Sequence, residues 1–481
     1  ETKRGGSQHK NGFWNVYSVY LPNILIGAMN VPGGLLGNGA SVPFGAGGIE
    51  ASEDGLAMWS LADELDVMGA CRPYPPREVG PPENIDLREL FPCHFFSSTL
   101  PILTSLEPEK VNLPYEPEAL IISRFNPMVS TVDRDRVAEM LAKMDFVMCF
   151  AIYPDETTEF ADIVIPEAHD YERWCLFPVN NLTVFVNPGP GPWEGQVLQP
   201  VVDPPEGVRH WAEFMMEVAD GLGVLPEMNE ALNARGGFGT TNDHALAPEQ
   251  KYTMQELAQR SFRLWTDKEG SEESFENHSF IELGEKTVEE SFPGLFSPAR
   301  IPVYFEHFID AGKNVEEATG RMGMDWWDVS PYHPLPEWHP CPAHQADDSE
   351  FGLFIANSKL PLHQQTLSSR NVWVDDLSGR NPLDYYVLIH TSVAKERNIE
   401  DGDLVWIESE VGRVKGKARV TECVHPRVVG TFGTLGRWGE GSGVGCGKGV
   451  HFNSLIKLGW DMVDTLSGQM DYCAKVKVYR A

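Results

Sequence analysis

The feature that most constrains the fold is an alternation of buried strand, amphipathic helix and buried strand. Continuous apolar runs at 119–123 and 146–150 predict two strands, and a third run at 161–166 predicts another. The apolar residues between the first two strands recur at helical spacing, at Val137, Met140, Leu141 and Met144. Such a βαβ unit predicts an α/β fold with a parallel, Rossmann-like sheet. Ligands bind such sheets at the carboxyl ends of the strands, here the loops around Asn126 and 151–158.

The last third of the chain has a different pattern, which predicts a small β-barrel. Short β-rich runs, several of them separated by Gly or Asp-Gly turns, lie at 352–356, 386–390, 404–408, 416–421, 427–431 and 476–479. Further helices are expected at 16–29, 208–222 and 392–397. We therefore expect three segments: an α/β portion at 1–224, an irregular acidic excursion at 225–350, and the barrel at 351–481.

Charge, cysteine spacing and hydrophobicity argue against several classes of protein. The formal net charge is 38 − 70 = −32, so the surface repels phosphate backbones and nucleic acid is not an expected partner. The eight cysteines include no C-x-x-C pair, which argues against a disulfide scaffold and a ferredoxin-type cluster site. The most apolar stretch, 13–36, is interrupted by Pro and Asn, and we expect no membrane span there. The chain does not open with Met, which we interpret as a mature fragment or the later part of a longer chain; the compartment stays open.

Four segments hold residues suited to chemistry. The glycine-rich run 441–449 has a G-x-G-x-x-G-like spacing, and it predicts either a loop that approaches a ligand closely or a flexible loop without a ligand. The polar loop 362–370 suits phosphate and purine edges, or it is a solvated loop. Residues 167–173 combine His with carboxylates, which fits either acid–base chemistry or a helix start. The fourth segment holds potential zinc ligands at His333, His339, Cys341 and His344. Interleaved prolines favour a surface segment over a zinc site.

Taken in order, these segments resemble the molybdopterin oxidoreductases of the dimethyl-sulfoxide-reductase family, over the later part of that family's large subunit. The stretches that carry the resemblance are 6–12, 24–38, 126–127, 153–157, 161–166, 172–173, 362–370, 398–403 and 453–455. The last three are similar to the family's C-terminal dinucleotide-binding barrel, which is of the double-psi type. The chain departs from the family at Ala151, where an Asp would bind a guanine edge. It also departs at His390-Thr391, where Asn-Pro is usual.

The resemblance implies a cofactor and a set of residues that hold it. The cofactor is two molybdopterin guanine dinucleotides around molybdenum or tungsten. His9 is implied as a catalytic residue near the active site. The implied cofactor contacts are Ser7, Gln8, Asn126, Tyr153, Thr157, Asp162, Arg173, His363, Gln364, Gln365, Thr366, Ser368, Ser369, Arg370 and Asn453. No metal ligand is expected in this segment, because the family's metal-ligating residue precedes the matched region.

The implied function is that of part of a catalytic subunit. Its reaction is two-electron oxidoreduction, often oxo transfer or hydroxylation, with electrons passing through iron–sulfur clusters held elsewhere. A 4Fe-4S cluster would lie in the missing N-terminal part or in a partner. Implied partners are the N-terminal half of the large subunit, in the same or a separate chain, and a ferredoxin-like iron–sulfur protein; a membrane anchor is a further candidate. A non-redox hydratase, a scaffold that has lost the pterin, and an unrelated nucleotide-binding protein stay open as alternatives.

Overall fold

The computed structural model describes residues 4–29, 31–34, 49–51, 57–59, 90–91, 99–113, 115–176, 191–196, 198–235, 238, 244–265, 275, 280–288, 292, 303–363 and 368–481. The chain forms two compact units. Unit 1 comprises Glu1–Tyr17, Val79–Val164 and Phe308–Ala481, and unit 2 comprises Ser18–Glu78 and Ile165–His307. The three-part division expected from the sequence stays a prediction.

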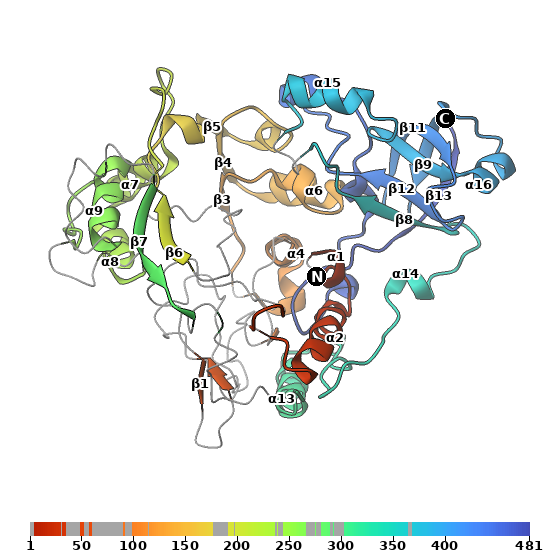
Figure 1. Cartoon of the computed structure of the whole chain (residues 1–481), viewed down its shortest axis with the longest axis horizontal. Coiled ribbons are helices and arrows are strands. Elements are labelled where there is room, and N and C mark those ends of the chain that lie inside the picture. Colours follow the sequence, from red (N-terminus) through yellow and green to blue (C-terminus); the bar gives the residue numbers. More distant parts are fainter. Residues whose placement is uncertain are drawn as a thin grey trace. The chain divides into compact units, whose positions relative to one another are not determined.

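A parallel pair of strands forms the centre of the α/β portion (Figure 1). β3 (Ala119–Ser123) pairs in parallel with β4 (Phe146–Ala151), and β5 (Ile163–Pro166) is the other neighbour of β4. α6 (Arg134–Lys143) links β3 to β4 and buries Val137, Met140 and Leu141. The short helices α4 (Leu100–Leu106) and α5 (Pro127–Ser130) flank this unit, together with the turns η2 (Pro108–Val111) and η3 (Thr158–Phe160). The predicted α/β fold is confirmed.

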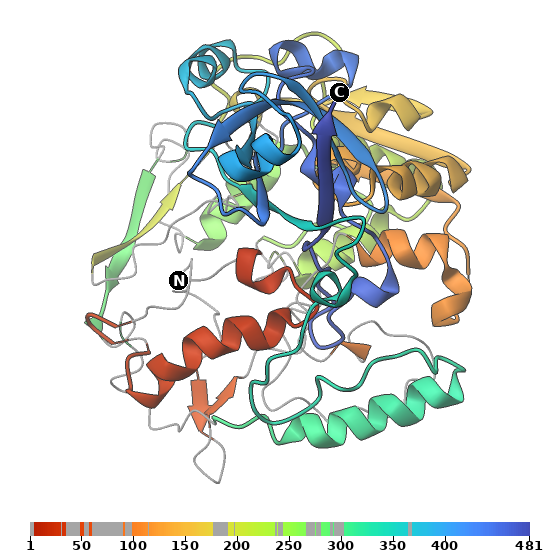
Figure 2. The same ribbon diagram turned by 90° about the vertical axis from the view of Figure 1, so that its right-hand side faces the viewer.

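The C-terminal region is a closed six-stranded barrel with the order β10-β11-β9-β12-β8-β13 (Figures 1 and 2). Its strands are β8 (Leu353–Ser358), β9 (Tyr386–His390), β10 (Leu404–Glu408), β11 (Arg413–Thr421), β12 (Val428–Phe432) and β13 (Lys475–Arg480). The β11–β9 and β12–β8 pairs are parallel, and the other pairs are antiparallel. Inward residues alternate with outward ones, so Val405 and Ile407 are buried while Leu404 is exposed. The predicted barrel is confirmed; its double-psi type stays a prediction.

Two helices of the barrel region begin at side-chain caps. α15 (Val372–Arg380) begins after Asn371, whose Oδ1 accepts hydrogen bonds from the amides of Trp373 and Val374. α16 (Thr391–Glu396) begins after His390, whose Nδ1 accepts from the Ser392 amide at 3.1 Å. His390 therefore caps a helix at the position where the family usually has Asn-Pro. The remaining elements are α14 (Pro342–Gln345), η6 (Glu440–Gly445), η7 (Phe452–Leu455) and η8 (Trp460–Met462).

An aromatic cluster joins the N-terminal part of unit 1 to later segments. α1 (Arg4–Ser7) and α2 (Gly12–Leu25) come first along the chain, and α13 (His307–Arg321) comes before the barrel. The buried Trp14 donates its indole N–H to the Pro331 carbonyl at 2.9 Å and stacks on the ring of His333. α2 begins four residues before the expected start at 16 and ends at Leu25 rather than 29. Gly27 adopts a left-handed φ of 68°, which ends the helix.

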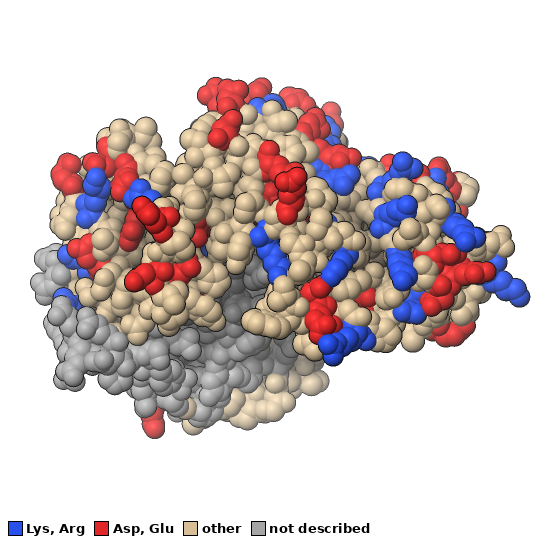
Figure 3. All heavy atoms as spheres, turned by 90° about the horizontal axis from the view of Figure 1, so that it is seen from above, with Lys and Arg blue, Asp and Glu red and all other residues tan. Residues whose placement is uncertain are grey.

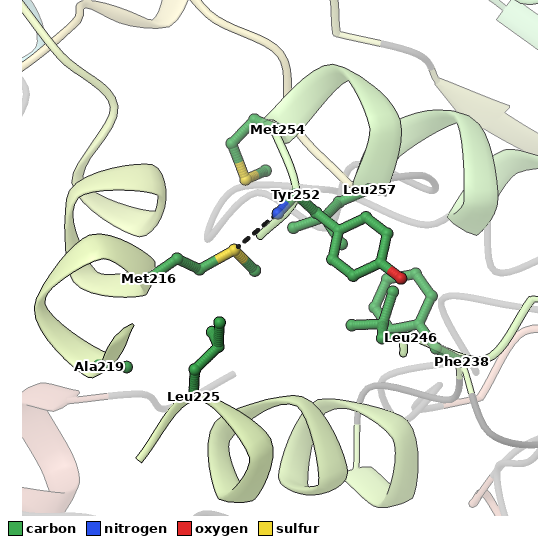
Figure 4. Close-up of a cluster of buried hydrophobic side chains, with 8 residues drawn as sticks. All are labelled: Met216, Ala219, Leu225, Phe238, Leu246, Tyr252, Met254 and Leu257. Carbon is green, nitrogen blue, oxygen red and sulfur yellow. Dashed lines mark hydrogen bonds between the residues drawn. The ribbon is translucent and has the colours of Figure 1, made fainter. Parts of the chain in front are cut away.

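Unit 2 has a helical core, shown in Figure 4. α7 (Trp211–Leu222), α8 (Leu225–Arg235) and α9 (Met254–Trp265) contribute to it, and its buried members are Met216, Ala219, Leu225, Phe238, Leu246, Tyr252, Met254 and Leu257. The Tyr252 amide donates to the Met216 sulfur at 3.4 Å. α7 agrees with the helix expected at 208–222, whereas α8 and α9 are regular helices inside the segment 225–350, where an irregular excursion is expected. The unit also contains β1 (Ile49–Ala51), β2 (Ala57–Trp59), β6 (Gly191–Gln196), β7 (Phe280–Lys286) and η4 (Asp170–Glu172).

Charged side chains of both signs are intermingled over the barrel on the face shown in Figure 3. Several form exposed pairs, such as Arg419 with Asp401 and Arg480 with Asp403. Within the residues that the structure describes, no helix is both long enough and apolar enough to cross a membrane.

Candidate functional site

The centre of the candidate site is the carboxylate of Glu156, in the loop that follows β4. Glu156 is fully buried, and the guanidinium of Arg437 binds it through Nε at 2.8 Å and Nη2 at 2.6 Å. The Ser442 hydroxyl donates at 2.8 Å, and the amides of Trp438 and Gly439 donate at 3.2 Å. Burial alone would raise the pKa of Glu156, but the hydrogen bonds and charge of Arg437 outweigh it and hold that pKa well below its usual range. The loop after β4 and the segment 437–442 are therefore tied together by a buried ion pair.

Asn126 joins the loop after β3 to the same carboxylate. Its Nδ2 donates to Glu156 at 2.9 Å, and its Oδ1 accepts from the Thr157 hydroxyl at 2.6 Å. The Thr157 hydroxyl oxygen accepts from the Met128 amide at 3.3 Å. Asn126 and Thr157, both predicted contacts, thus hydrogen-bond the loop after β3 to the loop after β4. They lie at the carboxyl edge of the sheet, where the fold places ligands.

The glycine run 441–449 packs against this edge for a steric reason. A Cβ on Gly441 would lie 1.9 Å from the Pro154 carbonyl oxygen, and one on Gly445 would lie 2.4 Å from the Ser369 carbonyl oxygen. Gly443 has a φ of 58°, which glycine adopts without strain. The glycines therefore allow close contact between this run and two other loops of unit 1.

Arg370 lies over Tyr153 beside the glycine run. Its guanidinium carbon is 4.5 Å from the centre of the half-exposed Tyr153 ring, and its Nη2 donates to the Pro154 carbonyl. Ser369 is buried and accepts from Arg437 at 3.3 Å. Among the described residues, Arg370 forms no ion pair with a carboxylate, whereas Arg437 is neutralised by Glu156. Arg370 is thus a cation available to an anionic ligand.

His363 lies in a second polar chain on the barrel. Its Nε2 is 2.9 Å from the Tyr385 hydroxyl, which donates to Asp375 at 2.9 Å, and its Nδ1 is 3.2 Å from the Ser368 hydroxyl. Lys448 reaches both oxygens of Asp375 at 2.6 Å. Burial lowers the pKa of His363 and raises that of Tyr385, which favours the neutral forms of both. The predicted contacts Gln364, Gln365 and Thr366 lie outside the described residues.

Asn453 lies against the start of the βαβ helix. Its Nδ2 donates to the Val129 carbonyl at 2.8 Å, and its own carbonyl accepts from the Asp133 amide at 2.9 Å. His451 is buried beside it, and its Nε2 also lies 3.0 Å from the Val129 carbonyl. Burial lowers the pKa of His451 to about 4, so the ring is neutral at physiological pH.

The predicted residues Asp162 and Arg173 form their described contacts with residues outside the Glu156 centre. The Asp162 carboxylate accepts a hydrogen bond from the Val147 amide at 2.8 Å and so binds the backbone of β4. Arg173 belongs to unit 2, where it is buried and pairs with Glu167 at 2.7 Å and with Asp170. His169 caps η4 in a capping box with Glu172, which supports the helix-start interpretation of 167–173.

The N-terminal segment of unit 1 carries Ser7, Gln8 and His9. Ser7 is the last residue of α1, and the Gln8 carbonyl accepts from the Tyr472 amide at 3.0 Å. His9 Nδ1 lies 3.8 Å from a carboxylate oxygen of Asp471, and this carboxylate raises the pKa of His9. His9 therefore faces the segment that precedes the last barrel strand.

The sequence reasoning missed Glu156, Arg437 and Ser442. Glu156 lies inside the motif 153–157, yet only Tyr153 and Thr157 were interpreted as contacts. Its partner Arg437 is 281 positions away, and no local pattern connects the two. The available signal was the carboxylate of Glu156 between two motif residues that were interpreted as contacts, since a charge that becomes buried with them needs a partner.

Two family models match the chain. The molybdopterin oxidoreductase model matches residues 14–181, and the molydopterin dinucleotide binding domain model matches residues 354–473. The second range covers the barrel from β8 to β12, with His363, Arg370 and Arg437, and ends before β13; the first contains the strand-end loops with Asn126 and Glu156. The chain thus combines the two domains of a molybdopterin-binding protein.

Individual relatives agree with this class. The molybdopterin-containing subunit PhsA of thiosulfate reductase from Salmonella typhimurium is 22% identical, with 76% of this chain and 44% of the relative covered. One subunit of sulfite dehydrogenase from Allochromatium vinosum is 20% identical, with 91% and 49% covered. The molybdopterin-containing subunit ArrA of arsenate respiratory reductase from Chrysiogenes arsenatis is 24% identical, with 76% and 46% covered. The chain therefore belongs to the molybdopterin oxidoreductases of the dimethyl-sulfoxide-reductase family, and it spans about half the length of these relatives.

A solved structure shows the same fold. Acetylene hydratase from Pelobacter acetylenicus superposes with a TM-score of 0.51 at 17% identity, over 80% of this chain and 47% of that chain. At this identity the likeness concerns the fold alone.

The donor set of the site fits a pterin dinucleotide. Such a ligand needs cations for its diphosphate and polar groups for its ring edges. Arg370 supplies a guanidinium that no described carboxylate neutralises. The Ser123 hydroxyl, at the carboxyl end of β3, has no hydrogen-bond partner within the described part of the chain. The site therefore offers both an anion-binding group and a polar group that a ligand could satisfy.

Proposed function

We propose that this chain is part of the catalytic subunit of a molybdenum- or tungsten-dependent oxidoreductase that binds two molybdopterin guanine dinucleotides. The observation that carries the proposal is the Glu156–Arg437 pair, which joins the dinucleotide-binding barrel to the ligand-binding edge of the α/β sheet. Arg370 lies at this junction, where it would bind a cofactor phosphate, while Asn126 and Thr157 hold the loops in place. When bound, the metal centre supplies two-electron chemistry that side chains cannot perform.

His9 is the proposed catalytic residue of this chain. The carboxylate of Asp471 faces its ring at 3.8 Å, and the Lys10 amide donates to the same carboxylate at 2.9 Å. This arrangement orients the imidazole next to the C-terminal segment. The proposed cofactor contacts Ser7 and Gln8 precede it directly; Arg173 and Asp162 stay proposed contacts as well.

We infer that other protein parts complete the enzyme. The relatives are named as subunits, and this chain covers less than half of each of those compared above. The sheet exposes Ile121, Phe146 and Ile163, which suits coverage by further protein. The proposed complement is the N-terminal half of the large subunit, an iron–sulfur electron-transfer protein with a 4Fe-4S cluster, and a membrane anchor.

A scaffold function is the second candidate. Ala151 at the end of β4 offers no carboxylate to a guanine edge, and both polar atoms of Asn126 are engaged within the chain. A scaffold would keep the Glu156 pair for stability alone. A hydratase would keep the cofactor but carry out no net redox reaction.

The test of the cofactor site is the pterin and metal content of an Arg370→Met variant, purified natively with its partners. We expect about a tenfold or greater loss of bound pterin, since a lost charged hydrogen bond costs about 1.5–3 kcal/mol. Arg380→Met is the matched control, because Arg380 is an exposed residue of α15 whose ion pair within the described part of the chain is with Asp376. Unchanged pterin content in Arg370→Met would contradict the proposed phosphate contact.

The His9→Ala variant tests the catalytic assignment. Its cofactor content is first shown to be normal, and its turnover is then measured with thiosulfate, arsenate and sulfite.

A further inference from the structure

A group of metal-ligating side chains lies away from the Glu156 centre, where α14 meets the segment before β13. The sulfur atoms of Cys341 and Cys473 and a carboxylate oxygen of Asp471 all lie within 4.8 Å of one another. His344 Nδ1 lies 3.0 Å from the Cys341 sulfur. The four residues come from two short motifs, C-x-x-H at 341–344 and D-x-C at 471–473.

We propose that Cys341, His344, Asp471 and Cys473 form a structural zinc site. Two thiolates, an imidazole and a carboxylate are ligands that Zn²⁺ prefers, and four protein ligands make a closed tetrahedral site. On a tetrahedral zinc, two sulfurs lie about 3.8 Å apart and a sulfur and a nitrogen lie about 3.6 Å apart. The ligand atoms of Cys341, Asp471 and Cys473 already lie within 4.8 Å of one another, whereas His344 contacts only the Cys341 sulfur of this group and would turn its ring to reach the shared position.

Burial supports a cation at this position. The side chain of Asp471 is fully buried and Cys341 is 7% exposed. Two backbone amides fix the carboxylate, those of Lys10 at 2.9 Å and Cys473 at 2.7 Å. Each oxygen keeps a second lone pair for another partner. His9 faces the Asp471 carboxylate from one side at 3.8 Å, and zinc would supply positive charge on the side of the two thiols.

The zinc would fasten the segment that leads into the barrel to the segment that leads into its last strand. Lys475 follows this second segment and reaches the Ala346 carbonyl at 2.6 Å, so the two segments already run together. The site goes beyond the proposed function, because it involves neither the cofactor loops nor electron transfer; it shares with that function only the carboxylate of Asp471, which also faces His9. Its ligands are about 130 positions apart along the chain, which is why no zinc spacing is visible in the segment 333–344.

The experiment is zinc analysis of the full protein, purified under reducing conditions and dialysed against metal-free buffer. We expect about one zinc per chain in the wild type and less than about a tenth of that in Cys341→Ser and Cys473→Ser. Cys423→Ser is the matched control, since Cys423 is exposed and belongs to no such group. His339→Ala controls for the second group of potential ligands, His333, Glu337 and His339. Both controls should keep their zinc.

Cobalt substitution gives a readout that does not depend on the folding of variants. Wild-type protein with Co²⁺ in place of zinc should show thiolate-to-cobalt charge-transfer absorption. Wild-type protein without zinc and without this absorption would overturn the proposal, as would zinc that persists in both cysteine variants. A Cys341–Cys473 disulfide, found by peptide mapping of denatured protein prepared without reductant, would also overturn it. Molybdenum and tungsten are measured separately in the same samples, so failure here is distinguishable from failure of the proposed function.

Discussion

The guanidinium of Arg437 and the carboxylate of Glu156 form a two-point hydrogen-bonded pair that is almost completely buried. Arg437 follows a barrel strand, and Glu156 follows a strand of the parallel sheet. The geometry matches the planar fork that arginine presents to carboxylates. Through this pair, residues far apart in the sequence define one ligand-binding edge.

Breaking this pair should strongly destabilise unit 1. Arg437→Met leaves the buried carboxylate without its main partner, and we expect a loss of about 3–5 kcal/mol in the free energy of unfolding. Urea unfolding followed by fluorescence measures the change. Asp376→Asn, which breaks the exposed pair with Arg380, should cost less than about 1 kcal/mol. If both substitutions lowered the free energy of unfolding equally, the buried pair would contribute no more to stability than the exposed pair.

Asn126→Asp should place a second negative charge against Glu156. The variant loses the Nδ2 donor that lies 2.9 Å from Glu156, and the two carboxylates would repel each other in a buried site. We expect a destabilisation of about 2–4 kcal/mol near neutral pH. The loss should shrink as the pH falls toward about 4, because one carboxyl then takes up a proton. Asn371→Asp is the control, since Asp also caps a helix and should leave stability unchanged. A pH-independent loss would count against charge repulsion.

The glycine run should tolerate no side chain at Gly441. A Cβ there would overlap the Pro154 carbonyl oxygen, so Gly441→Ala should cost about 1–3 kcal/mol and displace Arg370 from Tyr153. Gly379→Ala in α15 has open space around its Cβ, and it should be neutral or stabilise the protein by up to about 1 kcal/mol. Thermal unfolding and cofactor content of both variants check this, and an undisturbed Gly441→Ala would show that the close contact is dispensable.

Neutral His451 should make stability depend on pH. Its pKa is about 4 in the folded chain, compared with about 6.5 in the unfolded chain. Between these values the unfolded chain binds the proton and the folded chain does not, so stability falls as the pH drops from about 6.5 to about 4. The loss is at most about 3 kcal/mol.

The matching experiment compares unfolding of the wild type and His451→Gln across this range. The buried Asp464, whose pKa is raised to about 6, contributes an opposite slope to both proteins, so the difference between them isolates His451. We expect the wild type to lose stability relative to the variant as the pH falls. Parallel curves would mean that His451 has the same pKa in the folded and unfolded chains, which would contradict its burial in a neutral form.

The sequence predicts the parts of the fold that rest on local periodicity. The strands 386–390 and 404–408 agree with β9 and β10 at both ends, because short apolar runs and nearby Gly or Asp turns mark them. The closure of the barrel has no local signal, since β13 pairs with β10 across about 70 positions. α2 shows the limit at helix ends, where a single left-handed Gly27 decides the boundary.

The residues of the candidate site also divide into those with a local sequence signal and those that only a tertiary contact identifies. Asn126 and Thr157 were predicted from a motif, and the structure brings them together at the sheet edge. Arg437 was not predicted, because what makes it important is a tertiary contact with Glu156. The glycine run suggested a ligand loop, whereas its described contacts are with the Pro154 and Ser369 carbonyls. Steric fit between distant loops cannot be deduced from spacing alone.

The most direct test of the proposed function is a joint measurement of molybdenum, tungsten and pterin in the protein purified natively with its partners, normalised to this chain. We predict about one metal atom and two pterin dinucleotides per chain. A preparation that retains its partners yet contains neither pterin nor metal would contradict the proposal and would favour the scaffold function.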